Sequence, residues 1–236
     1  MNTYAQPTPY APVAAQASVD ERAGFIARTY VHLGAAILAF VALEVLAFQT
    51  RLPETMLGMV FGSGRFGWLV FLGLFMAAGW VANSWAQNGS SPVMQYAGLA
   101  LYTVAEVVLF MPLLLIANLQ FPGAIESAAL VTLVIFGALT GVVFLTRKDF
   151  SFLRTTLMFG AVAAFAIIVF AILFNFQLGV FFMGAMCVLA GGYILYYTSN
   201  VLHHYRTDQH VAAALALFSA VALLFWYVLQ LFMSRR

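Results

Sequence analysis

The chain has 236 residues, of which 64% are hydrophobic and only 8% are charged. Soluble globular domains carry about 45–50% apolar and about 25% charged residues, so this composition indicates a protein whose main solvent is lipid. The shortage of charge excludes a disordered chain, and a net charge of +2 gives no sign of a nucleic-acid partner. The single cysteine, Cys187, excludes an intrachain disulfide and a cysteine-based zinc cluster.

The first 24 residues differ in composition from the rest of the chain. Pro7, Pro9 and Pro12 lie here among Ala, Gln, Ser and Thr, and the charged run DER follows at 20–22. Such a segment has too little apolar surface to offset the entropy of ordering, so we expect a flexible tail over residues 1–24. It has neither the basic start nor the apolar core of a signal peptide, so we expect it to stay attached.

Apolar runs and short polar breaks alternate after the tail. Each run is close to the roughly 20 residues that cross a bilayer, and the breaks are too short to hold a second domain. The sequence therefore predicts an all-α integral membrane protein in which residues 25–236 form a bundle of seven transmembrane helices, with Asn175–Gln177 as the shortest break. The expected spans are 27–48, 66–85, 94–117, 128–146, 157–174, 178–198 and 211–233.

Proline and glycine mark special positions within these spans. Pro112 should kink the third span and free a backbone carbonyl. Gly137 and Gly141 form a G-x-x-x-G pair in the fourth span, which lets two helix backbones approach closely. The pair can form a dimer face, but we favour packing within one chain, because most helix faces in such a bundle are internal. We expect the same of Gly191 and Gly192.

The orientation of the bundle follows from its basic residues, which are more frequent in cytoplasmic loops. With seven spans, the N-terminus shares a side with the breaks at 86–93, 147–156 and 199–210. That side holds six basic residues and the other holds four. This bias places the N-terminus in the cytoplasm and the C-terminus outside. The six are Arg22, Arg28, Arg147, Lys148, Arg154 and Arg206.

Several chemistries are excluded by the residues that the spans contain. A seven-helix retinal protein needs a lysine within the membrane, and the only lysine here, Lys148, lies in a polar loop. No serine, histidine and acid share one membrane depth, and no glycine-rich phosphate loop follows a strand. We therefore expect no enzymatic activity and no cofactor.

Glu106 is the main candidate for an ion or proton site. It lies at the middle of the third span, and Gln95, Tyr102 and Thr103 fall at helical spacing from it. This polar stripe must face the bundle interior or a water-filled cavity, because lipid offers no hydrogen bonds. Two readings of Glu106 stay open: it binds a cation or carries a proton together with Tyr102, or it is a protonated acid bonded to a neighbouring helix.

Glu44 is a second candidate of the same kind, four residues from the end of the first span. An acid so close to the end of a helix can extend its carboxylate to the interface. We therefore expect an edge charge more than a functional site.

The four histidines are candidates for metal ligands. His32 lies at the start of the first span, and His203 and His204 lie at the end of the sixth, so all three are expected at the same membrane face. His210 follows in the same loop as His203 and His204. Histidine metal sites usually use i, i+4 pairs or carboxylate partners, whereas the adjacent His203 and His204 point in different directions on a helix. We expect solvated polar helix ends and no metal site.

Three segments in order resemble the Bax inhibitor family of seven-helix membrane proteins, and most closely its bacterial YccA branch. They are ARTYVHLGAAILAF at 27–40, LTRKDFSFLRTTLMFG at 145–160 and GGYILYYTSNVLHHY at 191–205. The resemblance runs from about residue 26 to the C-terminus. It implies a multi-pass protein of the bacterial inner membrane.

The family resemblance implies a site that this chain lacks. Some members are pH-sensitive calcium leak channels in which two aspartates, near the ends of the sixth and seventh helices, form a proton-sensitive dyad. These positions fall on Tyr197 and Ala220, and the last two spans contain no Asp or Glu. A carboxylate pair binds calcium when ionised and releases it when protonated, which a phenol and a methyl group cannot do.

The YccA branch itself is implied to bind and restrain a membrane-anchored AAA protease through its cytoplasmic tail. Because the dyad is missing, our first hypothesis is a non-enzymatic inner-membrane protein that modulates membrane protein quality control, with residues 1–23 as the handle. The alternative is a channel or transporter for calcium, protons or another cation, with Glu106 as the acid at the midplane. A second cytoplasmic contact would be the loop residues Arg147, Lys148, Asp149 and Arg154.

Overall fold

The computed structural model describes residues 11–62, 64–88 and 91–234. Within these ranges the chain forms eight α-helices and no strand. Seven of the helices are long and apolar enough to cross a membrane. The protein is therefore an all-α, multi-pass membrane protein, as the composition predicts. The seven are α1 (Val19–Ala47), α3 (Gly64–Ala86), α4 (Pro92–Gln120), α5 (Ala124–Thr146), α6 (Leu153–Phe174), α7 (Val180–His203) and α8 (His210–Ser234).

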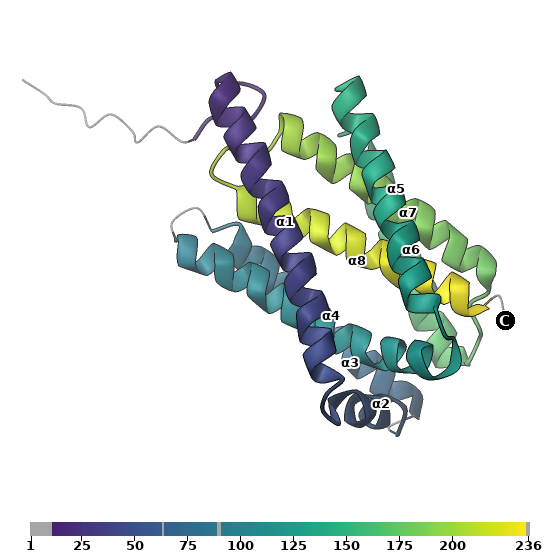
Figure 1. Ribbon diagram of the computed structural model, residues 1–236. Coiled ribbons are helices and arrows are strands. Elements are labelled where there is room, and N and C mark those ends of the chain that lie inside the picture. Colours follow the sequence, from purple (N-terminus) through teal and green to yellow (C-terminus); the bar gives the residue numbers. More distant parts are fainter. Residues whose placement is uncertain (1–10, 63, 89–90, 235–236) are drawn as a thin grey trace, which may run out of the picture.

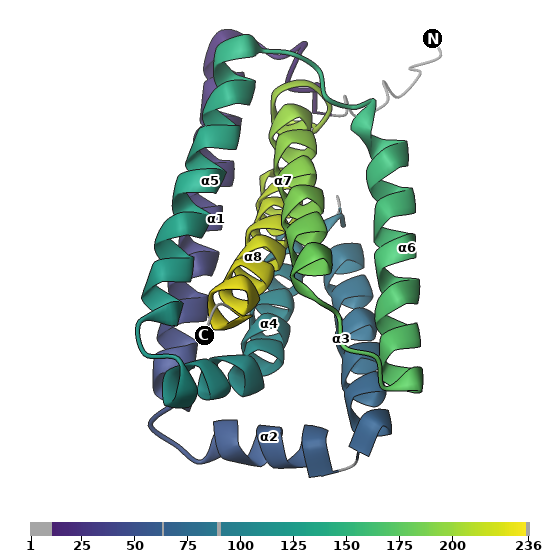
Figure 2. The same cartoon turned by 90° about the vertical axis from the view of Figure 1, so that its right-hand side faces the viewer.

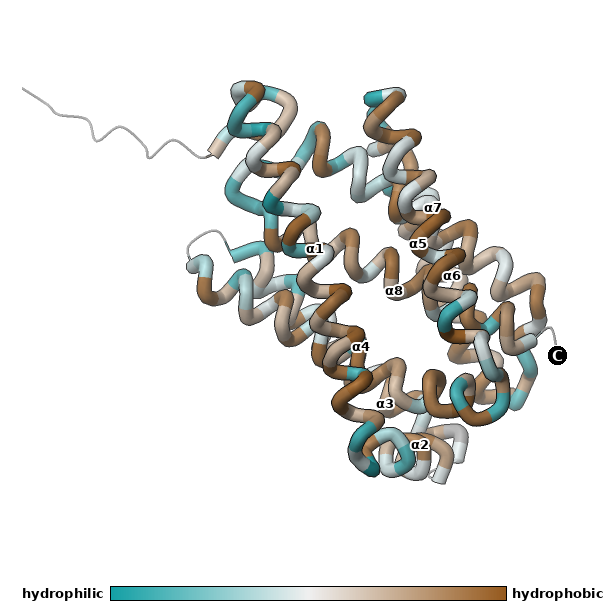
Figure 3. Tube along the Cα trace, viewed as in Figure 1, coloured by the Kyte–Doolittle hydropathy of each residue, from teal (hydrophilic) through white to brown (hydrophobic). Residues whose placement is uncertain are grey.

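Helix α8 forms the centre of the bundle (Figures 1 and 2). In its most apolar stretch 78% of the residues are buried, against 6% in α3. Its first half contains the run Ala212–Ala214 followed by Ala216, and such small residues let neighbouring helices approach closely. Hydrophobic residues follow the spans and hydrophilic ones gather at the helix ends (Figure 3), so the outer helices present apolar faces to lipid.

Helix α1 begins inside the expected tail. Ser18 is its N-cap: the Ser18 hydroxyl accepts from the Glu21 backbone N–H, and the Glu21 carboxylate accepts from the Ser18 N–H at 3.3 Å. This reciprocal capping box satisfies two backbone donors at once and fixes the first helical residue at Val19. Residues 19–24 are therefore helical rather than part of a tail.

The segment before α1 is attached to the connection between α7 and α8. The Ala14 N–H donates to the Tyr205 carbonyl at 2.8 Å, and the Thr207 N–H donates to the Pro12 carbonyl at 3.0 Å. The Ala14 side chain is fully buried. This segment is therefore attached to the bundle, and the rest of the expected tail, residues 1–10, lies outside the described residues.

Helix α2 (Leu52–Gly62) lies within the stretch 49–65, which the sequence predicts to be a plain break between spans. Its 11 residues span only about 16 Å, too short to cross a bilayer. Pro53 lies in its first turn, where a missing backbone N–H carries no penalty. Figure 2 shows α2 lying across the end of the bundle, below α3 and α4.

The short break after α6 is confirmed. Asn175 adopts a left-handed conformation with φ 53°, and its backbone N–H donates to the Ala171 carbonyl. Asparagine tolerates this conformation better than most residues and is a frequent helix terminator. The break therefore separates α6 from α7, which starts at Val180, and makes the number of long helices odd. With an odd number, the described chain begins and ends at opposite ends of the bundle.

The glycines divide into two groups. A side chain at Gly191 or Gly192 would press on a neighbouring helix, with Leu157 of α6 only 2.7 Å from a Cβ at Gly192, so their packing within the chain is confirmed. At Gly137 and Gly141 nothing lies within 4 Å of the added atom. The expectation that this pair packs inside the bundle is wrong, because the glycine face of α5 points outward.

Gly98 provides a test of the close α3–α4 contact. A Cβ at Gly98 would lie 2.5 Å from the Ala82 carbonyl oxygen and 2.7 Å from the Ala86 nitrogen, both backbone atoms that cannot rotate away. We expect Gly98→Ala to lower the free energy of unfolding by about 1–3 kcal/mol. Thermal unfolding in detergent measures the change.

Gly137→Ala is the matched control, because it adds the same methyl group to an open helix face. It should unfold at or slightly above the wild-type temperature, since alanine favours helix. Equal melting temperatures for the two variants would contradict the close approach of α3 and α4.

Candidate functional site

The polar stripe of α4 faces the bundle interior, as its spacing predicts. Gln95, Thr103 and Glu106 are all buried. The Gln95 amide donates to the Asn88 carbonyl at 2.8 Å, and the Thr103 hydroxyl donates to the Leu99 carbonyl at 2.9 Å. These two polar groups are satisfied locally, which leaves Tyr102 and Glu106 as the two members of the stripe that line a cavity.

Glu106 borders a cavity of about 680 Å³ between α3, α4, α6, α7 and α8. Aromatic rings make up much of the wall, while carboxyl, hydroxyl and amide groups are few. Among the described residues that line it there is no lysine, arginine or histidine, so the Glu106 carboxyl has no basic counter-ion there. The polar lining residues are Tyr102, Glu106, Asn175, Tyr193, Tyr197, Ser219, Tyr227 and Gln230.

The partner of Glu106 given by the described residues is a hydroxyl group. The Tyr102 hydroxyl interacts with the Glu106 carboxyl and also with the Ser219 hydroxyl of α8. The Ser219 hydroxyl in turn donates to the Ala216 carbonyl at 2.8 Å. Glu106, only 3% exposed, therefore ends a short chain of hydroxyls that links α4 to the central helix.

Both positions that resemble the family dyad lie on this same cavity. Tyr197 of α7 and Ala220 of α8 line it together with Glu106. The Tyr197 ring stacks on Tyr193 at a centroid distance of 5.6 Å, and the Tyr193 hydroxyl donates to the Leu157 carbonyl at 3.1 Å. The cavity thus keeps one acid, on α4, and has a phenol and a methyl group at the two positions on α7 and α8.

Glu44 lies elsewhere and contradicts our expectation of an edge charge. It is 5% exposed, and it lines a separate cavity of about 590 Å³ between α1, α4, α5 and α8. Neither of its carboxyl oxygens has a hydrogen-bond partner within the described ranges. Ala47, in the last turn of α1, packs with Val107 and Met111 of α4, so this end of α1 lies against the bundle.

The four histidines gather at one end of the bundle, which we call the histidine end: His32, His203, His204 and His210. The rings of His32 and His210 lie 5.0 Å apart, and Tyr96 of α4 contacts both. In the described part of the chain, no three histidine, cysteine or acidic side chains group as metal ligands would. The pairing of α1 with α8 through two histidines leaves no local signal in the sequence, because it joins residues 178 positions apart.

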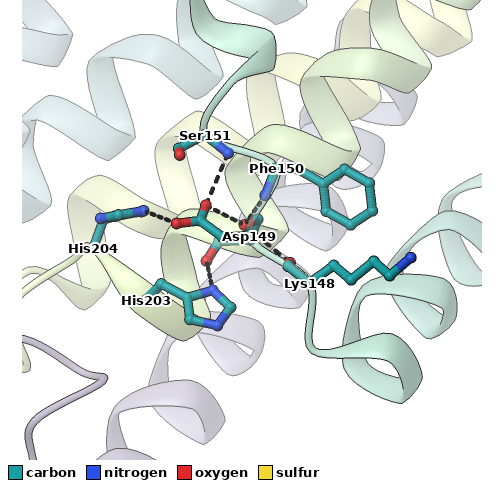
Figure 4. Close-up of polar contacts among 7 residues, drawn as sticks. Lys148, Asp149, Phe150, Ser151, His203 and His204 are labelled. Atoms are coloured by element: carbon teal, nitrogen blue, oxygen red, sulfur yellow. Dashed lines mark hydrogen bonds and ion pairs between the residues drawn. The ribbon is translucent and has the colours of Figure 1, made fainter.

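The loop between α5 and α6 is fastened to the histidine end (Figure 4). The Asp149 carboxylate lies 3.0 Å from the His204 Nε2 and accepts from the Ser151 N–H at 2.8 Å. The Phe150 N–H donates to the buried Ser199 hydroxyl, also at 2.8 Å. Burial opposes the shift, but the Ser151 amide and the His204 imidazole hold the pKa of Asp149 below its usual value.

The three basic side chains of the predicted contact loop do not join this network, which Lys148 enters only through its backbone carbonyl, an acceptor from the Ser199 hydroxyl at 3.5 Å. The Lys148 side chain points away from Asp149 (Figure 4), and Arg147 and Arg154 are exposed. Arg147 ends α5 in a left-handed conformation with φ 51°. The structure therefore brings Asp149 to α7 and leaves the three basic side chains facing solvent.

Seven apolar helices around a buried acid define a multi-pass α-helical membrane protein with an intramembrane polar cavity. The family model described as Inhibitor of apoptosis-promoting Bax1 matches residues 22–236. The chain therefore belongs to the Bax inhibitor family. No curated protein and no solved structure matches the chain.

The Asp149 network makes a pH prediction. Because the pKa of Asp149 is lowered in the folded protein, its stabilisation of the loop is present above the usual carboxyl pKa of about 4 and is lost as the pH falls through the lowered pKa. Hydrogen exchange of the Phe150 and Ser151 amides, corrected for intrinsic rates, should show protection at pH 5–8 that declines below about pH 4.

Asp149→Ala should reduce this protection about two- to fivefold at neutral pH, the range expected for an exposed ion pair. Asp20→Ala removes an acid at the same end of the bundle, in the first turn of α1, and serves as the control. Unchanged exchange in Asp149→Ala would mean that the Ser199 contact alone holds the loop.

Proposed function

We propose that the protein is a non-enzymatic cation channel or transporter of the Bax inhibitor type, in which Glu106 binds the cation or the proton. One observation carries this proposal: Glu106 shares its cavity with Tyr197 and Ala220. An acid on α4 thus lies in the space that the acids on α7 and α8 would occupy in members with the dyad. An intramembrane acid is by default a candidate functional residue, and this one has no basic partner among the described residues of its cavity.

The ligand set favours a proton or a monovalent cation over calcium. Calcium prefers six to eight oxygen ligands, whereas Glu106 supplies at most two carboxylate oxygens. The Tyr102 and Ser219 hydroxyls add neutral oxygens from α4 and α8. A single carboxyl group linked to hydroxyl groups can instead take up and release one proton or one monovalent cation.

Ion flux in proteoliposomes tests the proposal. Purified full-length protein should carry a proton or monovalent-cation flux, recorded with entrapped pH- and cation-sensitive dyes. Glu106→Gln should reduce this flux at least tenfold, because the amide keeps the shape of the side chain and removes its charge. Glu54→Gln, which alters an exposed acid of α2, should leave the flux unchanged.

Calcium flux, measured in the same proteoliposomes, tests the effect of having Tyr197 and Ala220 at the two dyad positions. Calcium flux should be small and should change little between about pH 6 and 8, a range where an unperturbed tyrosine stays neutral. The double variant Tyr197→Asp with Ala220→Asp should become pH-sensitive. A large, steeply pH-dependent calcium flux in the wild type, or equal flux in wild type and Glu106→Gln, would overturn the proposal.

A second candidate function is the binding of a membrane-anchored AAA protease, as in a YccA-like modulator of membrane protein quality control. The observation that favours it is the ordered surface at the histidine end. There the segment 11–17 is hydrogen-bonded to the connection between α7 and α8, and the loop 147–152 is hydrogen-bonded to α7. We propose that this end faces the cytoplasm of a bacterial inner membrane, in line with the six-to-four distribution of basic residues.

Co-purification from solubilised membranes tests the second function. Deleting residues 2–9 should abolish recovery of the protease while the bundle stays folded, because the deletion stops before Ala14 and Ser18, which hold the start of α1. The charge-removing variant Arg147→Ala with Lys148→Ala should weaken recovery. If the truncated and full-length proteins recover the same partners, or if neither recovers a protease, this function is excluded.

A further inference from the structure

The cavity at Glu44 is a second polar site at membrane depth, separate from the one at Glu106. Its volume of about 590 Å³ lies in the range of small-molecule sites. Phe110 and Ala222 line both cavities and form the wall between them. The Phe110 ring is held in place on both sides, since it lies 5.2 Å from Phe40 and 5.0 Å from Trp226.

Two buried polar groups face this cavity without a partner. Both oxygens of Glu44, a side chain that is 5% exposed, and the hydroxyl of Thr132 on α5, which is 2% exposed, have no hydrogen-bond partner among the described residues. Burying such groups unpaired is unfavourable, and far more so for an ionised carboxylate. A ligand that donates hydrogen bonds or carries positive charge would remove this penalty.

The charge of the lining selects the ligand. Glu44 and Glu126 are both acidic, and none of the described residues that line the cavity is lysine, arginine or histidine. A phosphate or carboxylate would therefore meet only like charge, so the lining disfavours anionic lipid headgroups and fatty acids. Aromatic ring faces attract ammonium groups, and the rings here are those of Phe40, Phe48, Phe110, Phe218 and Phe225.

The lining is polar at one end and apolar along the rest. Glu44 and Glu126 come from the last turn of α1 and the first turn of α5, so they share one end of the bundle. The mouth between these two helices is lined by Val41, Val45 and Leu133, each at least half exposed. These exposed apolar side chains place the mouth on the surface that faces lipid, between α1 and α5, which flank α8 in Figure 1.

We propose that this cavity binds a single-chain amphipathic amine, with the ammonium group on the Glu44 carboxylate and the apolar chain between α1 and α5. The amine enters from the membrane through the mouth at Val41 and Leu133. Thr132 accepts a second hydrogen bond from a primary ammonium, and the phenylalanine rings enclose the methylene groups next to it. This site is independent of the function proposed for Glu106.

The test is equilibrium binding of radiolabelled dodecylamine to the full-length protein in phosphatidylcholine nanodiscs, with empty nanodiscs subtracted. We expect saturable binding of one amine per chain. Glu44→Gln should weaken binding at least tenfold, and Ala129→Phe, which fills the cavity without changing its charge, should abolish it. Glu106→Gln should bind within twofold of wild type. Melting temperatures confirm that each variant is folded.

A neutral chain of equal length distinguishes an amine site from a general acyl-chain groove. Unlabelled dodecylamine should displace the label at least tenfold better than 1-dodecanol. The proposal is overturned by a lack of saturable binding, by equal displacement by the alcohol, or by wild-type affinity in Glu44→Gln or Ala129→Phe. Loss of binding in Glu106→Gln with retention in Glu44→Gln would place the amine in the other cavity and would also overturn it.

Discussion

The burial of carboxyl groups without basic partners is the constraint on which the rest of this structure depends. Glu44 and Glu106 are both almost completely buried, and neither cavity contains a described lysine, arginine or histidine. In a low-dielectric bundle such acids lower the stability of the folded state, and apolar residues in their place would raise it. Their presence indicates that the two cavities are candidate functional sites.

Helix α8 is what allows two such cavities to exist in so small a bundle. Its alanine-rich, almost completely buried surface brings α1, α4, α5 and α7 close around it, so the remaining space lies on two sides of one central helix. Phe110 and Ala222 then separate the sides. Ser219 and Ala220 of α8 face the Glu106 cavity.

Much of the architecture could be predicted from the sequence, because spans of about 20 apolar residues and a period of 3.6 are local properties. The seven long helices, the break at Asn175 and the buried face around Glu106 all follow from them. The absence of acids from the last two spans is also evident from the sequence. The capping box of Ser18 and Glu21 was present in the sequence as well, yet the polar composition around it concealed the start of α1.

By itself, the sequence determined the class of protein, the number of spans and the family, because hydrocarbon requires apolar helices of fixed length. Only the tertiary structure decided which faces are covered: it buried Glu44 in a cavity, turned Gly137 outward, joined His32 to His210 and placed Glu106 in one space with Tyr197. In a membrane, both lipid and neighbouring helices accept an apolar surface, so hydrophobicity does not distinguish an outer face from an inner one. That choice is made by contacts between residues far apart in the chain.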